Sequence, residues 1–332
     1  MADDIVIDFG TENVVALSAK KGLVVNEPSI IARSISTGKV LAMGRRGLAM
    51  QEEIPGSLIL VRPVVNGSLS DLPALQSLGK MVIKRCGRSK LHRSKVIVCV
   101  SPAMSSLEKR AIRDALRSSG ASSVRFVLQA VAASVYAGVS PSDATGALVV
   151  DVGAGKTCVS AVSLGGVIDY TSSHAGGESM DNAIRKMLRN QRGVVISSSA
   201  AEEIRMMAGS VSGSSIHEAV EVIGYNALDG QKESIVVKAD EVRMACELVL
   251  EDIFSVVSDC LSKIPPELTY DLTSRGILLI GGLAMMNGLA EWLGEKLGLV
   301  VSVPDDPRTC IVKGAYRLIH MHSNTRGIIE EI

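Results

Sequence analysis

Residues 5–24 and 148–167 repeat one pattern, and this repeat constrains the fold more than any other feature. The segment IVIDFGTENVVALSAKKGLV aligns without a gap on LVVDVGAGKTCVSAVSLGGV. Each copy is an apolar strand run that ends in an aspartate, followed by a glycine-containing turn and a second strand run. The repeat predicts two halves of like fold that face each other, with a cleft lined by two similar turns. Such turns can hold a phosphate chain, so the pattern indicates nucleotide chemistry.

Length and composition agree with a large soluble protein. At 332 residues the chain predicts two domains, and 47% hydrophobic with 21% charged residues predicts packed globular structure. The formal net charge is zero, so it argues neither for nor against nucleic acid. The six cysteines are scattered without a CxxC pair, as is typical of buried thiols in a reducing compartment. The acidic start MADD and the lack of an apolar run of ~18 residues predict a cytosolic protein.

Hydrophobic periodicity predicts α/β architecture with mixed sheets. Ser105 and Glu108 match a helical capping box, and Gly120 stands where a C-terminal glycine belongs. Serine- and glycine-rich stretches at 197–199 and 209–215 predict loops, and Pro265-Pro266 interrupts the chain. The predicted strands are 4–8, 13–18, 23–25, 29–33, 39–43, 96–100, 124–128, 147–151, 157–163, 166–171 and 276–280. The predicted helices are 72–86, 105–118, 129–137, 178–190, 240–263, 285–296 and 309–321.

Many segments are similar to those of one family. They include IDFGTEN (7–13), NEPSIIA (26–32), VVDVGAGKT (149–157), GGESMDNAI (176–184) and RGILLIGGLAMMNGL (275–289). On these residues the chain resembles the MreB family of bacterial actins, in the actin/Hsp70/sugar-kinase superfamily, over nearly its whole length.

The resemblance implies an actin-like α/β fold: two duplicated ribonuclease-H-like domains around a nucleotide cleft, each with a small inserted subdomain. Domain I would comprise 1–144 plus 310–332, with its small subdomain at about 33–65. Domain II would comprise 145–309, with its small subdomain at about 182–240.

The two glycine turns are the predicted phosphate contacts. Small residues bring backbone N–H groups close to phosphate oxygens. The resemblance implies that the turns clasp the phosphates of ATP or ADP, and that Asp8 and Asp151 hold Mg²⁺ through water. Two ordinary hairpin turns with aspartate as turn former are the alternative. The turn residues are Gly10, Thr11, Glu12, Asn13, Gly153, Ala154, Gly155 and Lys156.

The chain departs from the family pattern at several of these positions. Ala154, Lys156 and Cys158 replace a glycine, a threonine and an acidic residue of the second turn. Lys156 would place a cation near the phosphates and strengthen binding without helping turnover, or else face solvent on a hairpin edge.

Gln129 is the candidate catalytic residue, because it stands where the family carries a glutamate that activates water. A carboxamide can orient water but cannot take its proton. Glutamine does orient water in small GTPases. The sequence therefore predicts at most a slow ATPase coupled to polymerisation, with loss of hydrolysis as the alternative.

The resemblance also implies an adenosine site built from an acidic and basic cluster on a helix and from a strand-to-helix turn. Arg205 replaces the usual lysine and Leu283 the third glycine of the turn. A solvated charge cluster is the alternative. The implied residues are Glu202, Glu203, Arg205, Gly281, Gly282, Leu283 and Ala284.

Residues 80–95 carry seven lysines and arginines and no acid. Basic residues near an anionic leaflet contribute about 1 kcal/mol each. The resemblance implies weak membrane docking through Lys90, Leu91 and Arg93, and a solvated loop is the alternative. No aromatic residues interleave the cluster, so nucleic acid is not expected as a partner.

Together these features predict a cytoplasmic protein, peripheral at the inner face of the cell membrane. It would bind ATP and Mg²⁺, polymerise with itself, and organise cell shape and cell-wall synthesis with transmembrane cell-shape partners. A degenerate MreB-like scaffold or regulatory filament with little or no ATP hydrolysis is the alternative. A small-molecule kinase or chaperone-like ATPase of the superfamily is disfavoured, because the similarity extends beyond the turns.

Overall fold

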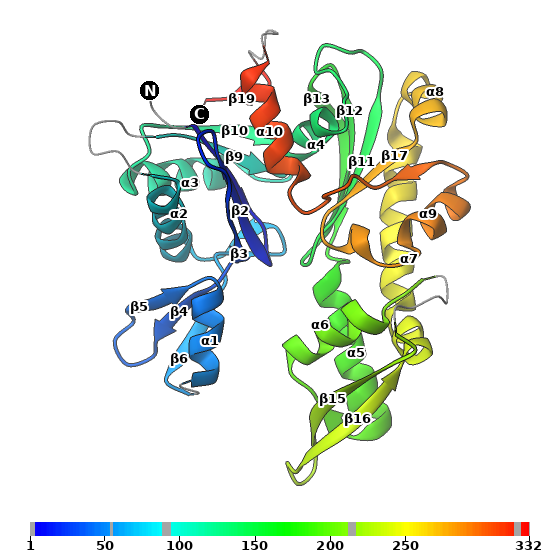
Figure 1. Ribbon diagram of the computed structural model, residues 1–332. Coiled ribbons are helices and arrows are strands. Elements are labelled where there is room, and N and C mark those ends of the chain that lie inside the picture. The colour runs from blue at the N-terminus through cyan, green and yellow to red at the C-terminus, as the bar shows by residue number, and fades with distance from the viewer. Residues whose placement is uncertain (1–3, 54–55, 88–93, 212–216, 322–326, 332) are drawn as a thin grey trace. The chain divides into compact units, whose positions relative to one another are not determined.

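The computed structural model describes residues 4–53, 56–87, 94–211, 217–321 and 327–331. The chain divides into two compact units, and most of their elements are labelled in Figure 1. Unit 1 comprises Met1–Ala144, Val162–Val167 and Thr309–Ile332, and unit 2 comprises Thr145–Ala161 and Ile168–Arg308. Each is described by itself below.

Unit 1 is built on a six-stranded sheet of order β19-β10-β9-β1-β2-β3. Strand β1 pairs antiparallel with β2 and parallel with β9, and β9 pairs parallel with β10. The strands are β1 (Asp4–Phe9), β2 (Asn13–Ser18), β3 (Gly22–Pro28), β9 (Lys95–Val100), β10 (Ser123–Leu128) and β19 (Ile329–Glu330). The helices that pack on it are α2 (Leu72–Gly87), α3 (Ser106–Ser118), α4 (Gln129–Tyr136) and α10 (Cys310–His320).

The alternation of side chains along β1 decides where its aspartate lies. Ile5, Ile7 and Phe9 belong to the buried cluster formed with α2 and α3. Because successive side chains point to opposite faces of a sheet, Val6 and Asp8 face the other side. Helices α4 and α10 pack against this side of the sheet. The fold thus brings Asp8 next to the start of α4.

The predicted capping residues at the two ends of α3 are confirmed. The Ser105 hydroxyl accepts from the Glu108 N–H and the Glu108 carboxylate accepts from the Ser105 N–H, which forms the capping box. At the other end, the Gly120 N–H donates to Arg117 and the Ala121 N–H to Leu116. Gly120 has a φ of 115°, which a glycine adopts without a steric penalty. These bonds satisfy the last carbonyls of the helix.

A small three-stranded sheet forms a separate part of unit 1, with order β5-β4-β6. Its core is Ala32, Ala42 and Leu58. The elements are β4 (Ile31–Ser34), β5 (Val40–Met43), α1 (Arg45–Glu53) and β6 (Leu58–Val61), followed by the short pair β7 (Val64–Val65) and β8 (Ser68–Leu69). Periodicity did not predict α1, which is short and only weakly apolar.

The second sheet repeats the arrangement of the first, with order β13-β12-β11-β17-β18. Strand β11 pairs parallel with β17, and β17 with β18, as β1 pairs with β9. Leu148, Val150 and Val152 point into the core beneath the helices, so Asp151 points to the opposite face. The strands are β11 (Ala147–Val152), β12 (Thr157–Ser163), β13 (Gly166–Ser173), β17 (Ile277–Ile280) and β18 (Val301–Ser302).

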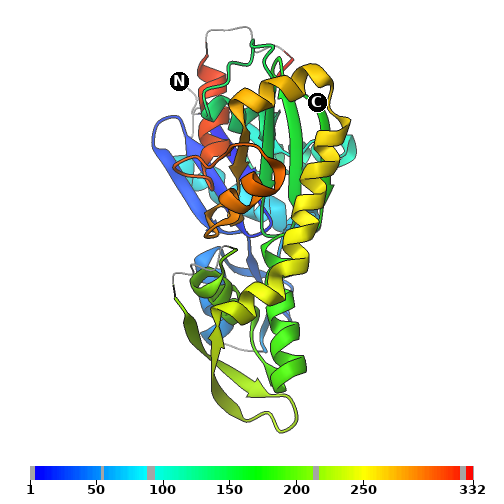
Figure 2. The ribbon, with the colours of Figure 1, turned by 90° about the vertical axis from the view of Figure 1, so that its right-hand side faces the viewer.

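Unit 2 adds helices and a three-stranded sheet of order β14-β15-β16. Figure 2 shows α7 as one continuous helix, which begins directly after β16. The helices are α5 (Gly177–Arg192), α6 (Ser198–Ala208), α7 (Ala239–Lys263), α8 (Pro266–Arg275), the 3₁₀ helix η1 (Leu283–Met285) and α9 (Leu289–Leu297). The strands are β14 (Val194–Val195), β15 (Ala219–Asn226) and β16 (Lys232–Lys238).

Two predictions about unit 2 were wrong, and one was confirmed. The stretch 197–199 is not a loop, because the Ser197 hydroxyl accepts from the Ala200 N–H at 3.0 Å and caps α6. The prediction that Pro265-Pro266 interrupts the chain is confirmed, since α7 ends at Lys263 and α8 begins at Pro266, where a missing N–H costs nothing. The β15–β16 hairpin was not predicted. The predicted helix 285–296 begins only at Leu289, because η1 and a turn precede it.

Candidate functional site

The two glycine turns are closed by the same backbone hydrogen bond. The Gly10 N–H donates to the Asn13 carbonyl at 3.0 Å, and the Gly153 N–H donates to the Lys156 carbonyl at 2.9 Å. A Cβ on Gly10 would lie 2.8 Å from the Asn13 oxygen, so only glycine fits there. The repeat read from the sequence is therefore present in the hydrogen bonds of the backbone. Gly155 is buried within the second turn.

The first turn is held in place by contacts with residues 62 and 67 of unit 1. The Gly67 N–H donates to the Thr11 hydroxyl at 3.2 Å, and the Arg62 guanidinium donates to the Thr11 carbonyl at 2.8 Å. The same guanidinium pairs with the Glu12 carboxylate at 2.9 Å. Sequence reasoning missed Arg62, because it lies 51 residues from Thr11 along the chain.

Gln129 contacts Asp8 directly. Its Nε2 donates to Asp8 Oδ1 at 2.8 Å, across 121 residues of sequence. An ionised carboxylate only accepts hydrogen bonds, so this contact fixes which end of the carboxamide faces Asp8. It leaves Gln129 Oε1 as an acceptor for water. The predicted catalytic residue and one predicted metal ligand thus form a single cluster in unit 1.

The second turn rests on the N-terminus of α5. The Gly177 N–H donates to the Gly153 carbonyl at 3.1 Å, and the Glu178 N–H to the Ala154 carbonyl at 2.8 Å. A Cβ on Gly176 would lie 2.5 Å from the Ala154 oxygen, so this approach requires glycine. Gly176 and Gly177 were not among the predicted site residues, although two glycines at a helix start are a signal of close backbone approach.

Asp151 lies against the predicted strand-to-helix turn. A Cβ on Gly281 would be 2.6 Å from Asp151 Oδ1, and Gly281 has a φ of +92° that favours glycine. Burial raises the pKa of the Asp151 carboxyl to about 6, and the charge of Lys156 opposes that rise. Desolvation thus outweighs the favourable charge of Lys156 at this carboxyl group.

Arg205 is held by a residue that the sequence analysis did not single out. Its Nε pairs with Asp181 Oδ1 at 2.6 Å, and both side chains are mostly buried. Glu202 lies at 3.9 Å from the same guanidinium, a longer contact. A Cβ on Gly177 would be 3.5 Å from Arg205 Cζ, so the pair adjoins the start of α5. Burial raises the pKa of Asp181, and the Arg205 hydrogen bond opposes the rise.

The remaining predicted residues take different positions. Glu203 is exposed on α6. Leu283 and Ala284 are buried in η1 as members of the unit 2 core, so their side chains serve packing. Gly282 begins that 3₁₀ helix directly after Gly281. The structure thus gathers Asp151, the second turn, Arg205 and the Gly281 turn in unit 2.

Asp8 in unit 1 and Asp151 in unit 2 are each, within their own unit, the kind of carboxylate ligand that a hydrated magnesium ion uses. No three His, Cys, Asp or Glu side chains gather as metal ligands within the described ranges. Mg²⁺ needs only one or two carboxylates when phosphate oxygens and waters fill the other positions. Asp8 and Asp151 each end a strand beside a glycine turn, and a residue with a Cβ would not fit at Gly10 or Gly281.

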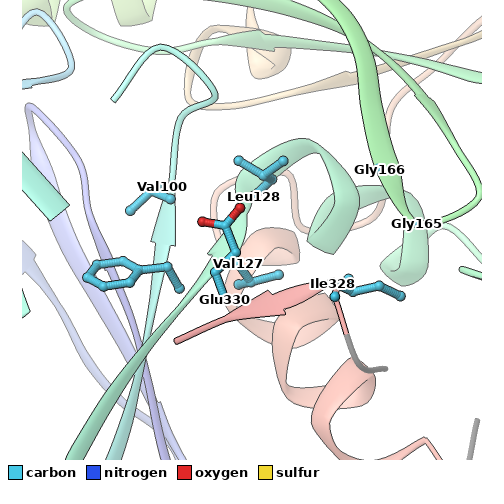
Figure 3. A pocket seen from close by; sticks show the side chains of 9 residues that line it. Val100, Val127, Leu128, Gly165, Gly166, Ile328 and Glu330 are labelled. Carbon is cyan, nitrogen blue, oxygen red and sulfur yellow. The ribbon is translucent and has the colours of Figure 1, made fainter. Parts of the chain in front are cut away.

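A cavity of about 150 Å³ lies elsewhere in unit 1. Figure 3 shows the Glu330 carboxylate near Val100, Val127 and Leu128 in its lining. Glu330 pairs with Lys109 at 2.8 Å, so its charge is already balanced. None of the predicted site residues lines this cavity.

Comparison with known proteins identifies the family. The family model described as MreB/Mbl protein matches residues 2–326. The chain belongs to the MreB/Mbl family. This membership confirms the resemblance read from the sequence. The cell shape-determining protein MreB of Escherichia coli (strain K12) is 34% identical over 331 residues, covering 97% of this chain and 95% of that protein. The cell shape-determining protein Mbl of Bacillus subtilis (strain 168) is 30% identical over 314 residues, covering 94% of each.

Solved structures of MreB-like proteins confirm the actin-like α/β fold. MreB5 of Spiroplasma citri bound to AMPPNP matches with a TM-score of 0.90 and 25% identity, covering 96% of each chain. A MamK double helical filament matches with a TM-score of 0.81 and 18% identity, covering 96% of this chain and 100% of that one.

The predicted membrane residues Lys90, Leu91 and Arg93 lie outside the described residues. Among the described helices, none is long and apolar enough to cross a bilayer.

Proposed function

We propose that this MreB/Mbl protein binds ATP and ADP with Mg²⁺ and polymerises into filaments that organise cell shape and cell-wall synthesis. The observation that carries the proposal is the pair of turns that are closed by the same backbone hydrogen bond, each after a strand with an aspartate as its next-to-last residue. MreB5, a relative of the same fold, has been solved with AMPPNP and with ADP. Filament formation is supported by MamK, a protein of the same fold that has been solved as a double helical filament.

Each turn is assigned to phosphate through its backbone N–H groups. Because the Gly10 and Gly153 N–H groups close the turns, the N–H groups of the residues that follow them are the ones assigned to phosphate. Gly176 and Gly177 allow α5 to approach the second turn closely. Asp8 and Asp151 would hold Mg²⁺ through its water shell. The ion would supply neutralisation of phosphate charge.

The adenosine part is assigned to Arg205 and the Gly281 turn. The ion pair with Asp181 already holds the Arg205 side chain in one position. Arg205 would therefore lose little side-chain entropy when the nucleotide binds to its guanidinium group. Glu202 would accept from a ribose hydroxyl, because its contact with Arg205 is long and its side chain is partly exposed.

The hydrolytic step is assigned to Gln129. With Nε2 donating to Asp8, Oε1 can accept from the attacking water and orient it. The carboxamide takes no proton, so turnover would be slow. The contact with Asp8 favours a hydrolysing protein over a scaffold, since it fixes the orientation of the carboxamide.

Sedimentation and phosphate release test the proposal, each with ATP, ADP or no nucleotide. We expect wild-type protein to pellet with ATP and to release phosphate slowly. Gln129→Ala should pellet as well but release phosphate at least about tenfold more slowly, since water loses its acceptor.

Gln129→Glu is the companion variant. It places a carboxylate against Asp8, so it should bind nucleotide more weakly without Mg²⁺. If wild-type assembly ignores nucleotide, releases no phosphate, and only Gln129→Glu hydrolyses ATP, then the scaffold alternative replaces the proposal.

We further propose that the filaments lie at the inner face of the cell membrane, with transmembrane cell-shape proteins as partners. The support is the basic segment 80–95, which contains Leu91. In co-sedimentation with anionic liposomes, wild-type protein should pellet and Lys90→Glu plus Leu91→Glu should stay largely in solution. Equal pelleting of both, or pelleting with neutral liposomes alone, would contradict this assignment.

A further inference from the structure

Lys156 extends from a rigid point of the second turn. Its carbonyl accepts the Gly153 N–H that closes the turn. The next residue, Thr157, is fully buried, and its hydroxyl donates to the Ala175 carbonyl at 2.8 Å. The backbone on both sides of Lys156 is therefore fixed. The ammonium group can reach only as far from the turn as its side chain is long.

The charge of Lys156 is available to a ligand. Within the part of the chain that the structure describes, Lys156 forms no ion pair within 4.0 Å, whereas Arg205 is paired with Asp181. The acidic group on which Lys156 acts is Asp151, the proposed magnesium ligand of the same unit. Lys156 is thus a cation whose backbone is held in the turn and whose charge acts on the carboxylate proposed for the divalent ion.

We propose that Lys156 carries part of the charge neutralisation that Mg²⁺ otherwise supplies, so that this chain binds nucleotide with a reduced dependence on Mg²⁺. The inference rests on the proposed function, because it concerns the same phosphate turn. An ammonium group offers three hydrogen-bond donors and one positive charge to phosphate oxygens, but it has half the charge of Mg²⁺ and cannot hold phosphate oxygens and waters in an octahedron. It would therefore aid binding without aiding hydrolysis.

Two cations that neutralise the same phosphates are partly redundant. Each adds less affinity when the other is present, and this coupling is reciprocal. The measurable consequence is the Mg²⁺ enhancement factor, defined as the dissociation constant in EDTA divided by that in MgCl₂. This factor should be smaller with Lys156 than without it.

Isothermal titration calorimetry with AMPPNP measures the factor and does not depend on hydrolysis. Lys156→Met should weaken binding about tenfold in EDTA and less than about threefold in saturating MgCl₂, as expected for a unit charge a few ångströms from phosphate. Lys156→Arg should keep most of the wild-type affinity in EDTA. Lys186→Met, an exposed lysine of α5 in the same unit, is the matched control and should change neither constant.

Thermal unfolding without nucleotide shows whether the variants are folded. If Lys156→Met and wild type have the same Mg²⁺ enhancement factor, the inference is wrong and the proposed function stands. If wild type binds no AMPPNP in either condition, both are wrong. A Lys156→Met protein that unfolds early leaves Lys156→Gln, a neutral and polar replacement, as the deciding variant: an enlarged factor supports the inference, and a wild-type factor overturns it.

Discussion

Arg205→Ala is expected to lower the free energy of unfolding of unit 2 by about 3 kcal/mol at neutral pH, because it leaves the Asp181 carboxylate buried and unpaired. Both side chains are mostly buried, with exposed fractions of 13% and 14%. The single tryptophan, Trp292, lies in α9 of unit 2. Its fluorescence during urea denaturation therefore reports on the unit that carries the substitution.

The stability that unit 2 loses in Arg205→Ala should depend on pH. Burial already raises the pKa of Asp181 above its ordinary value of 3.8, and removal of Arg205 removes the hydrogen bond and charge that oppose that rise. The folded variant then binds a proton that the unfolded chain releases, so its stability falls as pH rises from about 4 through the raised pKa. Denaturation of Arg205→Ala at pH 5 should recover part of the stability lost at pH 7.

A double variant provides the control for this prediction. Arg205→Ala combined with Asp181→Ala removes the uncompensated charge and should be more stable at pH 7 than Arg205→Ala alone. Equal losses at pH 5 and pH 7, or a double variant less stable than the single one, would show that the pair does not act through charge. AMPPNP affinity should fall in both variants, since both lack the guanidinium.

Gly314→Ala is expected to lower the free energy of unfolding of unit 1 by about 3 kcal/mol, because the added methyl group overpacks the contact between α10 and α4. A Cβ on Gly314 would lie 1.8 Å from the Ala132 carbonyl oxygen and 2.7 Å from its carbon. Backbone atoms cannot rotate away as a side chain does, so one helix must shift. Because α4 begins with Gln129, such a shift should also disturb the contact with Asp8 and lower phosphate release.

Hydrogen exchange of the α4 and α10 amides measures this effect within unit 1. Gly47→Ala, in helix α1 of the same unit, is the matched control: its Cβ would meet its nearest atom at 3.5 Å, an ordinary contact. Alanine is favoured over glycine inside a helix by up to about 1 kcal/mol, so Gly47→Ala should be neutral or stabilising. Unchanged exchange in Gly314→Ala would mean that the helices separate without cost.

Local sequence was sufficient for the elements whose signals lie close together along the chain. The capping box of α3 needs only residues three apart, and its prediction is confirmed. The twin turns need only four residues each, because the hydrogen bond from Gly10 to Asn13 closes within the turn. The helix α1 escaped prediction, since it packs on a small separate core. The β15–β16 hairpin was missed although its buried residues alternate along β15 and belong to the core of unit 2, a signal that the sequence carried.

Sequence alone therefore determined the duplicated strand-turn units, their aspartates and the family, because period-two alternation and turn chemistry are short-range properties. Only the tertiary structure decided that Asp181 holds Arg205 across 24 residues and that Gln129 donates to Asp8 across 121. Packing also selected Gly176 and Gly314 for close backbone approach. Such contacts depend on which faces meet after folding, and no local pattern along the chain encodes that meeting.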